Sequence, residues 1–274
     1  MYHRVLSAID GSLNAFAAGR YAVAVAQACG ATLYVAGVIT RKMTGREEGA
    51  LAESAARLVA EGEKRGVRSH ILIERGEAAR TLHVLAKENK ADVVLAASRH
   101  EDAEHRYFVR TVPQRLTGLL PMSLIVVRVA NLGVLAHPRE ILVPVTRNLP
   151  DGSAERAYLV SRLAKHYGAR LVVLHALEGS RQEGRAALHE AGARRVQAFV
   201  ERLDRESAQP QLRIVADPLV GRAIMREAAR HRHDLIIMGA SRRTLFARWR
   251  RGNPVEEVMR QAPCDLFVCR LRGA

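Results

Sequence analysis

The residues best suited to chemistry lie between positions 239 and 253, where glycine and arginine follow an apolar run. The stretch reads Gly239-Ala-Ser-Arg242, then nine residues, then Gly252-Asn253. Glycine lets backbone amides approach an anion closely, because no Cβ stands in the way. A helix that begins at Asn253 would add free N–H groups and the positive end of its dipole. These residue types in this order favour the binding of a phosphate group.

Arginine is concentrated in the same stretch. Its guanidinium binds phosphate oxygens through two parallel N–H groups, so these side chains can supply contacts that glycine amides would otherwise make. Arg242 either clamps a phosphate or plugs the pocket, and both alternatives stay open. Alternatively, these arginines form an ordinary solvent-exposed run of charges. Its members are Arg242, Arg243, Arg248, Arg250 and Arg251.

The chain repeats itself with an offset of 142 residues. The stretch from Asp92 reads DVVLAASRH, and the stretch from Asp234 reads DLIIMGASR. The same offset relates the segments TVPQ and NPVE farther along each copy. Repetition in this order predicts two tandem domains, 1–132 and 139–274.

Short apolar runs alternate with helical patterns in each copy. The runs carry Val, Ile and Leu at consecutive positions, as in parallel strands covered on both faces. Gly30 and Gly168 end two of the helical patterns. We therefore expect an α/β fold, Rossmann-like, with two doubly wound, mainly parallel five-stranded sheets flanked by helices. The expected strands are 4–9, 31–39, 68–74, 92–97, 123–129, 140–145, 169–176, 210–216, 234–239 and 264–270.

The last apolar run of each copy has no helix after it. Each run would therefore be an edge strand, and an unpaired apolar edge invites association with another strand. The two copies can satisfy both edges by pairing 123–129 with 264–270 about a pseudo-twofold axis. We expect this arrangement.

Composition narrows the class of protein. The chain has 274 residues and a formal net charge of +15, which attracts anions in general. Aromatic residues make up only 4%, which argues against a stacking platform for nucleic acid. No apolar run reaches the ~18 residues of a membrane span, and the amino end lacks the layout of a signal peptide. We expect a cytoplasmic protein, with its few cysteines as buried thiols.

Over nearly its whole length the chain resembles the universal stress protein family. That family carries Gly-x-x-Gly, nine residues and Gly-Ser/Thr at this loop, and its ATP-binding members use the pattern to hold the phosphates. Gly239 and Gly252 match it, whereas Arg242 replaces the middle glycine and Asn253 the hydroxyl. The resemblance implies an adenine nucleotide, ATP or AMP, or a similar anion, bound mainly by the second copy at these four residues and Arg243.

The first copy keeps a different part of the family pattern. Its loop has Arg99 and His100 and retains a hydroxyl at Thr111, but it has none of the glycines. Asp10 follows the first expected strand, where ATP-binding members have an Asp that contacts the nucleoside. The second copy has Thr146 there. These first-copy residues are the weaker candidates for nucleotide binding.

Each candidate also has an interpretation without a ligand. Thr111 with Gln114 has the pattern of a capping box, and Asn253 with Glu256 that of an N-cap with a capping acid. Asp10 can be a simple turn residue. The glycines of the second loop can likewise serve only the turn.

The resemblance implies a stress-response regulatory protein that binds a nucleotide and is not an enzyme. We expect no catalytic residue and no metal, because His231 and His233 lack a nearby third ligand and no carboxylate is placed to hold Mg²⁺ near the loop. His175 is interpreted as a packed histidine. One alternative is a slow ATPase or phosphotransferase. Another is an interaction module with degenerate sites that docks on a partner protein such as a transporter, and a homodimer is also considered.

Overall fold

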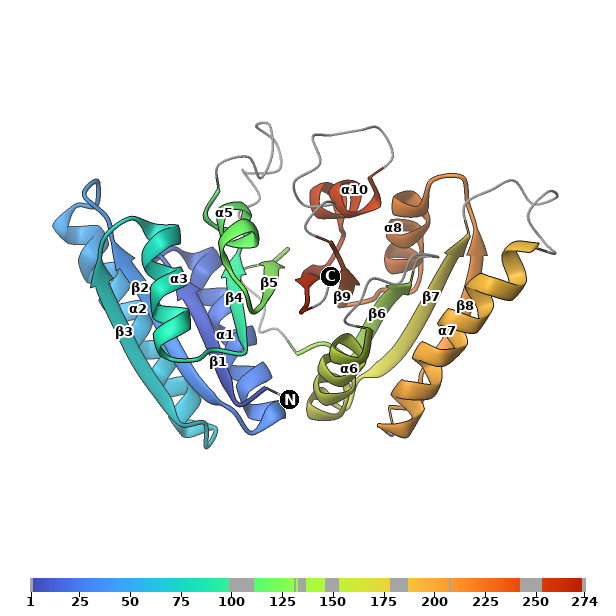
Figure 1. Ribbon diagram of the computed structural model, residues 1–274, viewed down its shortest axis with the longest axis horizontal. Coiled ribbons are helices and arrows are strands. Elements are labelled where there is room, and N and C mark those ends of the chain that lie inside the picture. The colour runs from blue at the N-terminus through green and yellow to red at the C-terminus, as the bar shows by residue number, and fades with distance from the viewer. Residues whose placement is uncertain are drawn as a thin grey trace. The chain divides into compact units, whose positions relative to one another are not determined.

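The computed structural model divides the chain into two compact units, Met1–Ala136 and His137–Ala274 (Figure 1). The sequence predicted domains of 1–132 and 139–274. The structure describes residues 2–98, 111–130, 132, 137–145, 153–177, 187–206, 208–241 and 253–272.

The first unit alternates strands and helices along the chain. Its described strands form a parallel sheet in the order β3-β2-β1-β4-β5. The elements are β1 (Arg4–Ile9), α1 (Leu13–Cys29), β2 (Thr32–Ile39), α2 (Gly45–Lys64), β3 (Ser69–Arg75), α3 (Ala78–Glu88), β4 (Val93–Ala97), α5 (Val112–Leu119) and β5 (Ser123–Arg128).

The second unit repeats this plan. Its described strands form a parallel sheet in the order β8-β7-β6-β9-β10, which is the order of the first unit. The elements are β6 (Glu140–Val145), α6 (Ser153–Tyr167), β7 (Arg170–Leu177), α7 (Ala187–Arg205), β8 (Gln211–Ala216), α8 (Val220–Arg230), β9 (Leu235–Gly239), α10 (Pro254–Gln261) and β10 (Asp265–Arg270).

The predicted fold class is confirmed, and each predicted strand matches its observed strand to within one residue at either end. The predicted pairing of the last strands concerns the placement of one unit against the other, and it stays a prediction. No helix in the described residues is long and apolar enough to cross a lipid bilayer.

Helices cover both faces of each sheet. In the first unit α1 and α2 pack together on one face, and α3 and α5 pack on the other (Figure 1). The central strands are accordingly buried, with Val5 and Val93 at 0% exposure. The prediction of buried thiols holds for Cys269, whereas Cys29 and Cys264 are half-buried.

Local signals set the ends of the helices. The Ser12 hydroxyl accepts a hydrogen bond from the N–H of Ala15 at 3.2 Å and begins α1. Thr44 and Glu47 form a reciprocal capping box at the start of α2. Gly30 and Gly168 end their helices with φ of 64° and 60°, the left-handed conformation predicted for them.

A repeated aspartate joins the first and fourth strands of each unit. Asp92 Oδ2 accepts the backbone N–H groups of His3 at 2.7 Å and Arg4 at 2.9 Å. In the second unit Asp234 Oδ2 accepts those of Arg139 at 2.8 Å and Glu140 at 3.0 Å. The aspartate that marks the repeat in the sequence therefore anchors β4 to β1 and β9 to β6 at their amino ends.

Gly11 allows α2 to pass beside the turn that follows β1. Its φ is 82°, and a Cβ at this position would lie 2.9 Å from the backbone nitrogen of Leu51. Both the conformation and the close approach require glycine here.

We predict that Gly11→Ala destabilises the protein more than Gly30→Ala. Both positions have positive φ, which costs alanine about 1–2 kcal/mol, but a Cβ at Gly30 meets open space. The clash with the Leu51 backbone should add about 1–3 kcal/mol at Gly11. Urea unfolding of the two variants measures the difference, and equal destabilisation would show that α2 does not pack against Gly11.

Candidate functional site

Each sheet has one pair of neighbouring strands whose connections lead in opposite directions. In the first unit the pair is β1 and β4, and in the second it is β6 and β9. Ligands of open α/β sheets bind beyond the carboxyl ends of the strands at such a switch point. The residues that follow these four strands are therefore the first place to examine.

Gly239 is the last residue of β9 and lies at the switch point of the second unit. The register places it beside Cys269 of β10. The next residue, Ala240, still donates its N–H to the carbonyl oxygen of Cys269 at 2.9 Å. The chain thus leaves the sheet just beyond Gly239, at the edge where this fold binds ligands.

Asn253 begins α10, the helix to which the chain returns. Its Oδ1 accepts the N–H of Val255 at 3.1 Å, and Pro254 is the first helical residue. The capping interpretation of Asn253 is confirmed. Any contact between Asn253 and a ligand stays a prediction.

The first turn of α10 is acidic. It contains Glu256 and Glu257. Burial raises the pKa of Glu256 and the Glu257 carboxylate adds to this, while Arg260 opposes it. Acidic groups already offset the positive end of this helix. Attraction for an anion must therefore come mainly from other groups.

Eight candidate residues fall outside the part of the chain that the structure describes. They are Arg99 and His100 of the first copy, and Arg242, Arg243, Arg248, Arg250, Arg251 and Gly252 of the second.

Asp10 directly follows β1 at the switch point of the first unit. Its carboxylate is exposed, and Oδ1 accepts the N–H of Ser12 at 3.0 Å. This bond shows that Asp10 takes part in the turn, and any contact between Asp10 and a ligand stays a prediction. Thr111 caps α5, with its Oγ1 accepting the N–H of Gln114 at 3.4 Å. Both residues therefore have local structural roles.

An ion pair that the sequence pattern did not reveal joins α3 and α5 near the carboxyl edge of the first sheet. Arg115 donates from Nη2 to Glu77 Oε2 at 2.8 Å. Glu77 also accepts the N–H groups of Ala79 and Arg80 at the start of α3. Burial raises the pKa of Glu77, but the Arg115 side chain and the two amides outweigh it, so the pKa is lowered. A carboxylate thus occupies this helix N-terminus.

Comparison of the two copies of the sequence could have shown that this pair of residues is not repeated. At the offset of 142 residues, Glu77 corresponds to Leu219 and Arg115 to Glu257. Leu219 makes no side-chain cap bond. In the second unit the carboxylate at the start of α8 comes from Asp217 instead, whose Oδ1 accepts the N–H of Leu219 at 2.9 Å.

His175 of β7 is paired in register with Val145, the last residue of β6, and is buried, as predicted, with 3% exposure. Its Nδ1 lies 3.0 Å from the carbonyl oxygen of Val145. Because a carbonyl oxygen can only accept, Nδ1 carries the hydrogen. Nε2 has no hydrogen-bond partner in the described part of the chain. The carboxyl end of β6 therefore has a polar group that the packing interpretation did not anticipate.

Arg156 of α6 adds a buried positive charge to the second unit. It is 4% exposed, and its guanidinium lies 4.9 Å from the centre of the Phe199 ring. Burial lowers its pKa to about 10, opposed by Cys269, so it stays charged at neutral pH. Counting back from the helix-ending glycines, Ala18 occupies this position in the first unit. The two copies thus differ in charge at this position.

The sequence predicted that His231 and His233 lack a nearby third metal ligand, and this stays a prediction. The Glu227 carboxylate lies 3.8 Å from Nε2 of His231 and 3.9 Å from Nε2 of His233. Arg213 already pairs with this carboxylate at 2.7 Å. Among the described residues no group of three or more His, Cys, Asp or Glu side chains could hold a metal ion.

Comparison with known families decides what kind of protein this is. The model of the Universal stress protein family matches residues 1–128 and again residues 138–270. The chain belongs to the universal stress protein family. No curated protein sequence matches it.

Solved structures share the fold of this universal stress protein at low sequence identity. One from Archaeoglobus fulgidus DSM 4304 is 15% identical with a TM-score of 0.68, covering 98% of this chain and 96% of that one. A putative one from Pseudomonas aeruginosa UCBPP-PA14 is 19% identical with a TM-score of 0.66, covering 97% and 92%. The cytoplasmic domain of a prokaryotic cation chloride cotransporter is 10% identical with a TM-score of 0.66, covering 100% and 97%.

We predict that Arg115→Met destabilises this universal stress protein by about 0.5–1 kcal/mol at pH 7, the range of a partly exposed ion pair. The folded state holds the pKa of Glu77 below its ordinary value of 4.5. The pair therefore contributes stability above that value and loses it as the pH falls through the folded-state pKa.

Urea unfolding at pH 7 and at pH values below 4 measures this difference. Arg80→Met, an exposed change at the start of the same α3, is the matched control and should have little effect. If the loss of unfolding free energy in Arg115→Met is the same at both pH values, the ion pair with Glu77 is not its cause.

Proposed function

We propose that this universal stress protein is a regulatory binding module for an adenine nucleotide or a similar phosphate-bearing anion. Its second unit would bind the ligand, between Gly239 and Asn253, without catalytic turnover. The main support for this proposal is the position of Gly239. It is the last residue of β9 at the switch point, and the next described helix, α10, begins with the cap at Asn253.

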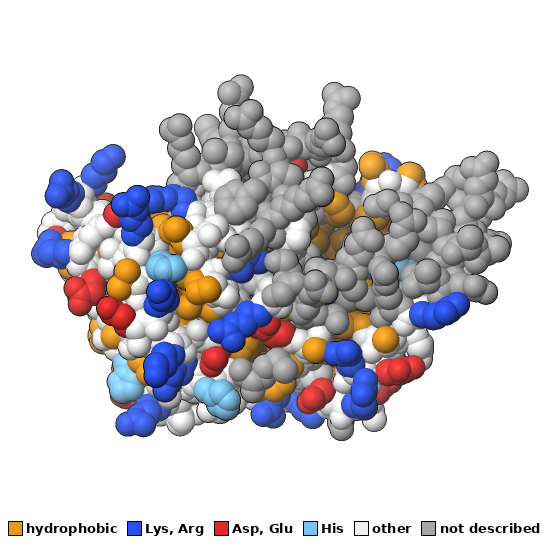
Figure 2. Space-filling model, in the orientation of Figure 1, with side chains coloured by type: hydrophobic (Ala, Val, Ile, Leu, Met, Phe, Trp, Pro, Cys, Tyr) orange, Lys and Arg blue, Asp and Glu red, His pale blue; other side chains and the backbone are white. Residues whose placement is uncertain are grey.

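The net positive charge of the chain does not itself favour the second unit as the nucleotide site; only the positions of particular positive side chains do. Lys and Arg side chains are spread over the visible face of both units, with acidic ones among them (Figure 2). The overall excess of positive charge therefore selects no single site. Arg156 places a buried cation near Cys269, the register neighbour of Gly239. The arginines of the following loop, Arg242 and Arg243, would supply the direct phosphate contacts.

The first unit is less suited to a phosphate. Ala97 stands where the second unit has Gly239. Asp10 is already bonded to the turn beside α2. We therefore propose that the first unit contributes little to nucleotide binding.

The nucleotide proposal predicts different results for two variants. Gly252→Val should abolish binding of ATP, because a branched side chain would enter a close phosphate contact. Asp10→Ala should leave binding nearly unchanged. Binding of ATP to the wild type should weaken as the salt concentration rises. Screening limits the reach of exposed charges to about 8 Å at physiological ionic strength. Isothermal titration of ATP and AMP measures all three, after mass spectrometry of any copurified nucleotide. Loss of most binding in Asp10→Ala would move the site to the first unit.

Binding of ATP to the Arg242→Gly variant shows whether Arg242 contacts the phosphate or blocks the pocket. If Arg242 contacts the phosphate, the variant should bind ATP more weakly than the wild type. Tighter binding would mean that the native site is closed to ATP, which favours the interaction module over the nucleotide module. Phosphate release in the same samples tests the alternative of a slow ATPase, and turnover that Gly252→Val removes would contradict a pure binding role.

A further inference from the structure

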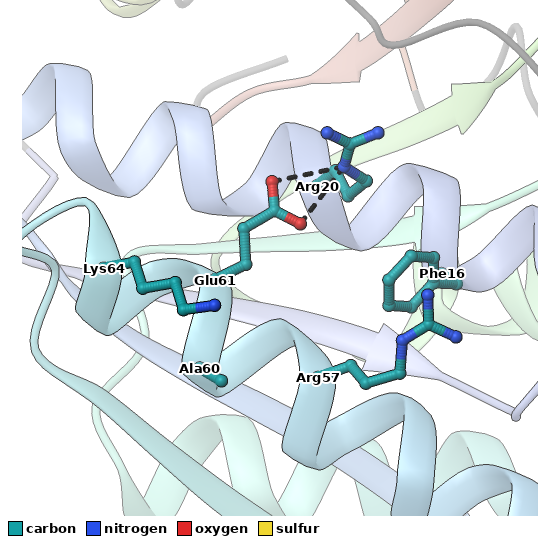
Figure 3. A pocket seen from close by; sticks show the side chains of 6 residues that line it. All are labelled: Phe16, Arg20, Arg57, Ala60, Glu61 and Lys64. Carbon is teal, nitrogen blue, oxygen red and sulfur yellow. Dashed lines mark hydrogen bonds and ion pairs between the residues drawn. The ribbon is translucent and has the colours of Figure 1, made fainter.

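A groove runs between α1 and α2 of the first unit, on the sheet face away from α3 and α5. Its volume is about 470 Å³, within the range of ligand-binding sites. Figure 3 shows side chains from both helices along it. The lining residues are Phe16, Arg20, Arg57, Ala60, Glu61 and Lys64.

Close packing of the two helices forms the base of this groove. A Cβ at Gly19 would lie 2.4 Å from Cδ1 of Leu58, so α1 and α2 approach closely there. Leu58 itself is fully buried. The larger side chains of the lining stand around this contact. Phe16 remains half-buried, so part of its ring faces the groove.

The groove has an excess of cations after its internal ion pairs are formed. Arg20 Nε lies 3.2 Å from both carboxylate oxygens of Glu61 (Figure 3). Arg65 Nη2 lies 2.6 Å from one of these oxygens. Glu61 is thus satisfied by two arginines. Arg57 lies 4.6 Å above the centre of the Phe16 ring. Neither Arg57 nor Lys64 has an ion pair in the described residues.

The fold does not require these side chains. Counting back from Gly30 and Gly168, Phe16 corresponds to Ala154 and Arg20 to Tyr158 in the second unit. The second unit forms the same pair of helices without them. Among the described residues the second unit has cation–ring contacts of its own, Arg156 on Phe199 and Arg162 on Tyr158. In both of these the arginine is buried or half-buried, whereas Arg57 is exposed.

The spacing of the two unpaired cations limits what can occupy the groove. Arg57 and Lys64 are seven residues apart on α2, which is two turns or about 10 Å. One phosphate or carboxylate would have to draw both long side chains toward a single point in order to pair with both. A flat layer of lipid headgroups does not enter a concave site between helices. A helix with acidic residues seven apart presents two carboxylates at this separation, with apolar side chains between them.

We propose that the α1–α2 groove binds an acidic amphipathic helix of a partner protein. Two carboxylates one heptad apart pair with Arg57 and Lys64. An apolar side chain between them packs on Phe16 and Ala60. The proposal is independent of nucleotide binding, because it uses only residues of the first unit outside the candidate nucleotide site.

A synthetic peptide tests this complementarity. The probe is a fluorescent 18-residue helix of Ala and Gln with two Glu seven residues apart and two Leu between them on the same face. The control peptide has the two Glu nine residues apart, which places them on opposite faces. Fluorescence anisotropy with the full-length wild type should show the first peptide binding about tenfold more tightly, a difference of ~1.4 kcal/mol. Equal binding, or no binding below 1 mM, would overturn the proposal.

Charge reversals on one helix give a matched comparison. Arg57→Glu and Lys64→Glu should each weaken binding of the probe about tenfold. Arg46→Glu makes the same charge change at an exposed position of α2 outside the groove, and should alter the Kd less than twofold. Phe16→Leu should weaken binding without changing charge. Equal loss in all the charge variants would mean non-specific attraction and would overturn the proposal.

Competition identifies other occupants. Inorganic phosphate at 10 mM and vesicles of phosphatidylserine and phosphatidylcholine are each added to the complex at constant ionic strength. Neither should displace the probe in the wild type. If vesicles bind the protein in an Arg57-dependent way and the peptide does not bind, the groove is a membrane contact and the proposal is wrong.

Discussion

The aspartate at the start of the fourth strand holds the centre of each sheet together. Asp92 and Asp234 each accept two backbone N–H groups, one from the first residue of the first strand of their unit and one from the residue before it. This contact fixes the parallel register of the two central strands from their amino ends. Their carboxyl ends are therefore fixed as well, and the residues that follow must emerge side by side. The switch point where a ligand can bind is a consequence of this register.

Two copies with the same framework present different chemistry at that point. The second unit has Gly239 at the strand end, with a buried cation, Arg156, near its neighbour in β10. The first unit has Ala97 at the corresponding strand end and a cationic groove on its α1–α2 face. Duplication can separate two functions in this way, because each unit folds around its own core while its edges and helix faces change independently. A nucleotide at one unit and a protein partner at the other is the division that these differences support.

Most of the fold was predictable because its signals are local. Strands buried on both faces give continuous apolar runs, so their limits were predicted to within one residue. Gly30, Thr111 and Asn253 were predicted correctly as helix ends for the same reason. Contacts between helices were not predictable. Glu77 and Arg115 are 38 residues apart in sequence, and Arg57 and Phe16 meet only because α1 packs on α2. Periodicity places each of them on a helix surface, but it does not show which surface they face.

Photoaffinity labelling with 8-azido-ATP tests the central claim most directly, because it locates the nucleotide on the chain without any substitution. The labelled wild type is digested, and modified peptides are identified by mass spectrometry with and without excess ATP. The azide is on the base and the account places the phosphates between Gly239 and Asn253, so it predicts ATP-sensitive label within the second unit, residues 137–274. Label concentrated in residues 4–119 of the first unit, or label that excess ATP does not reduce, would contradict it.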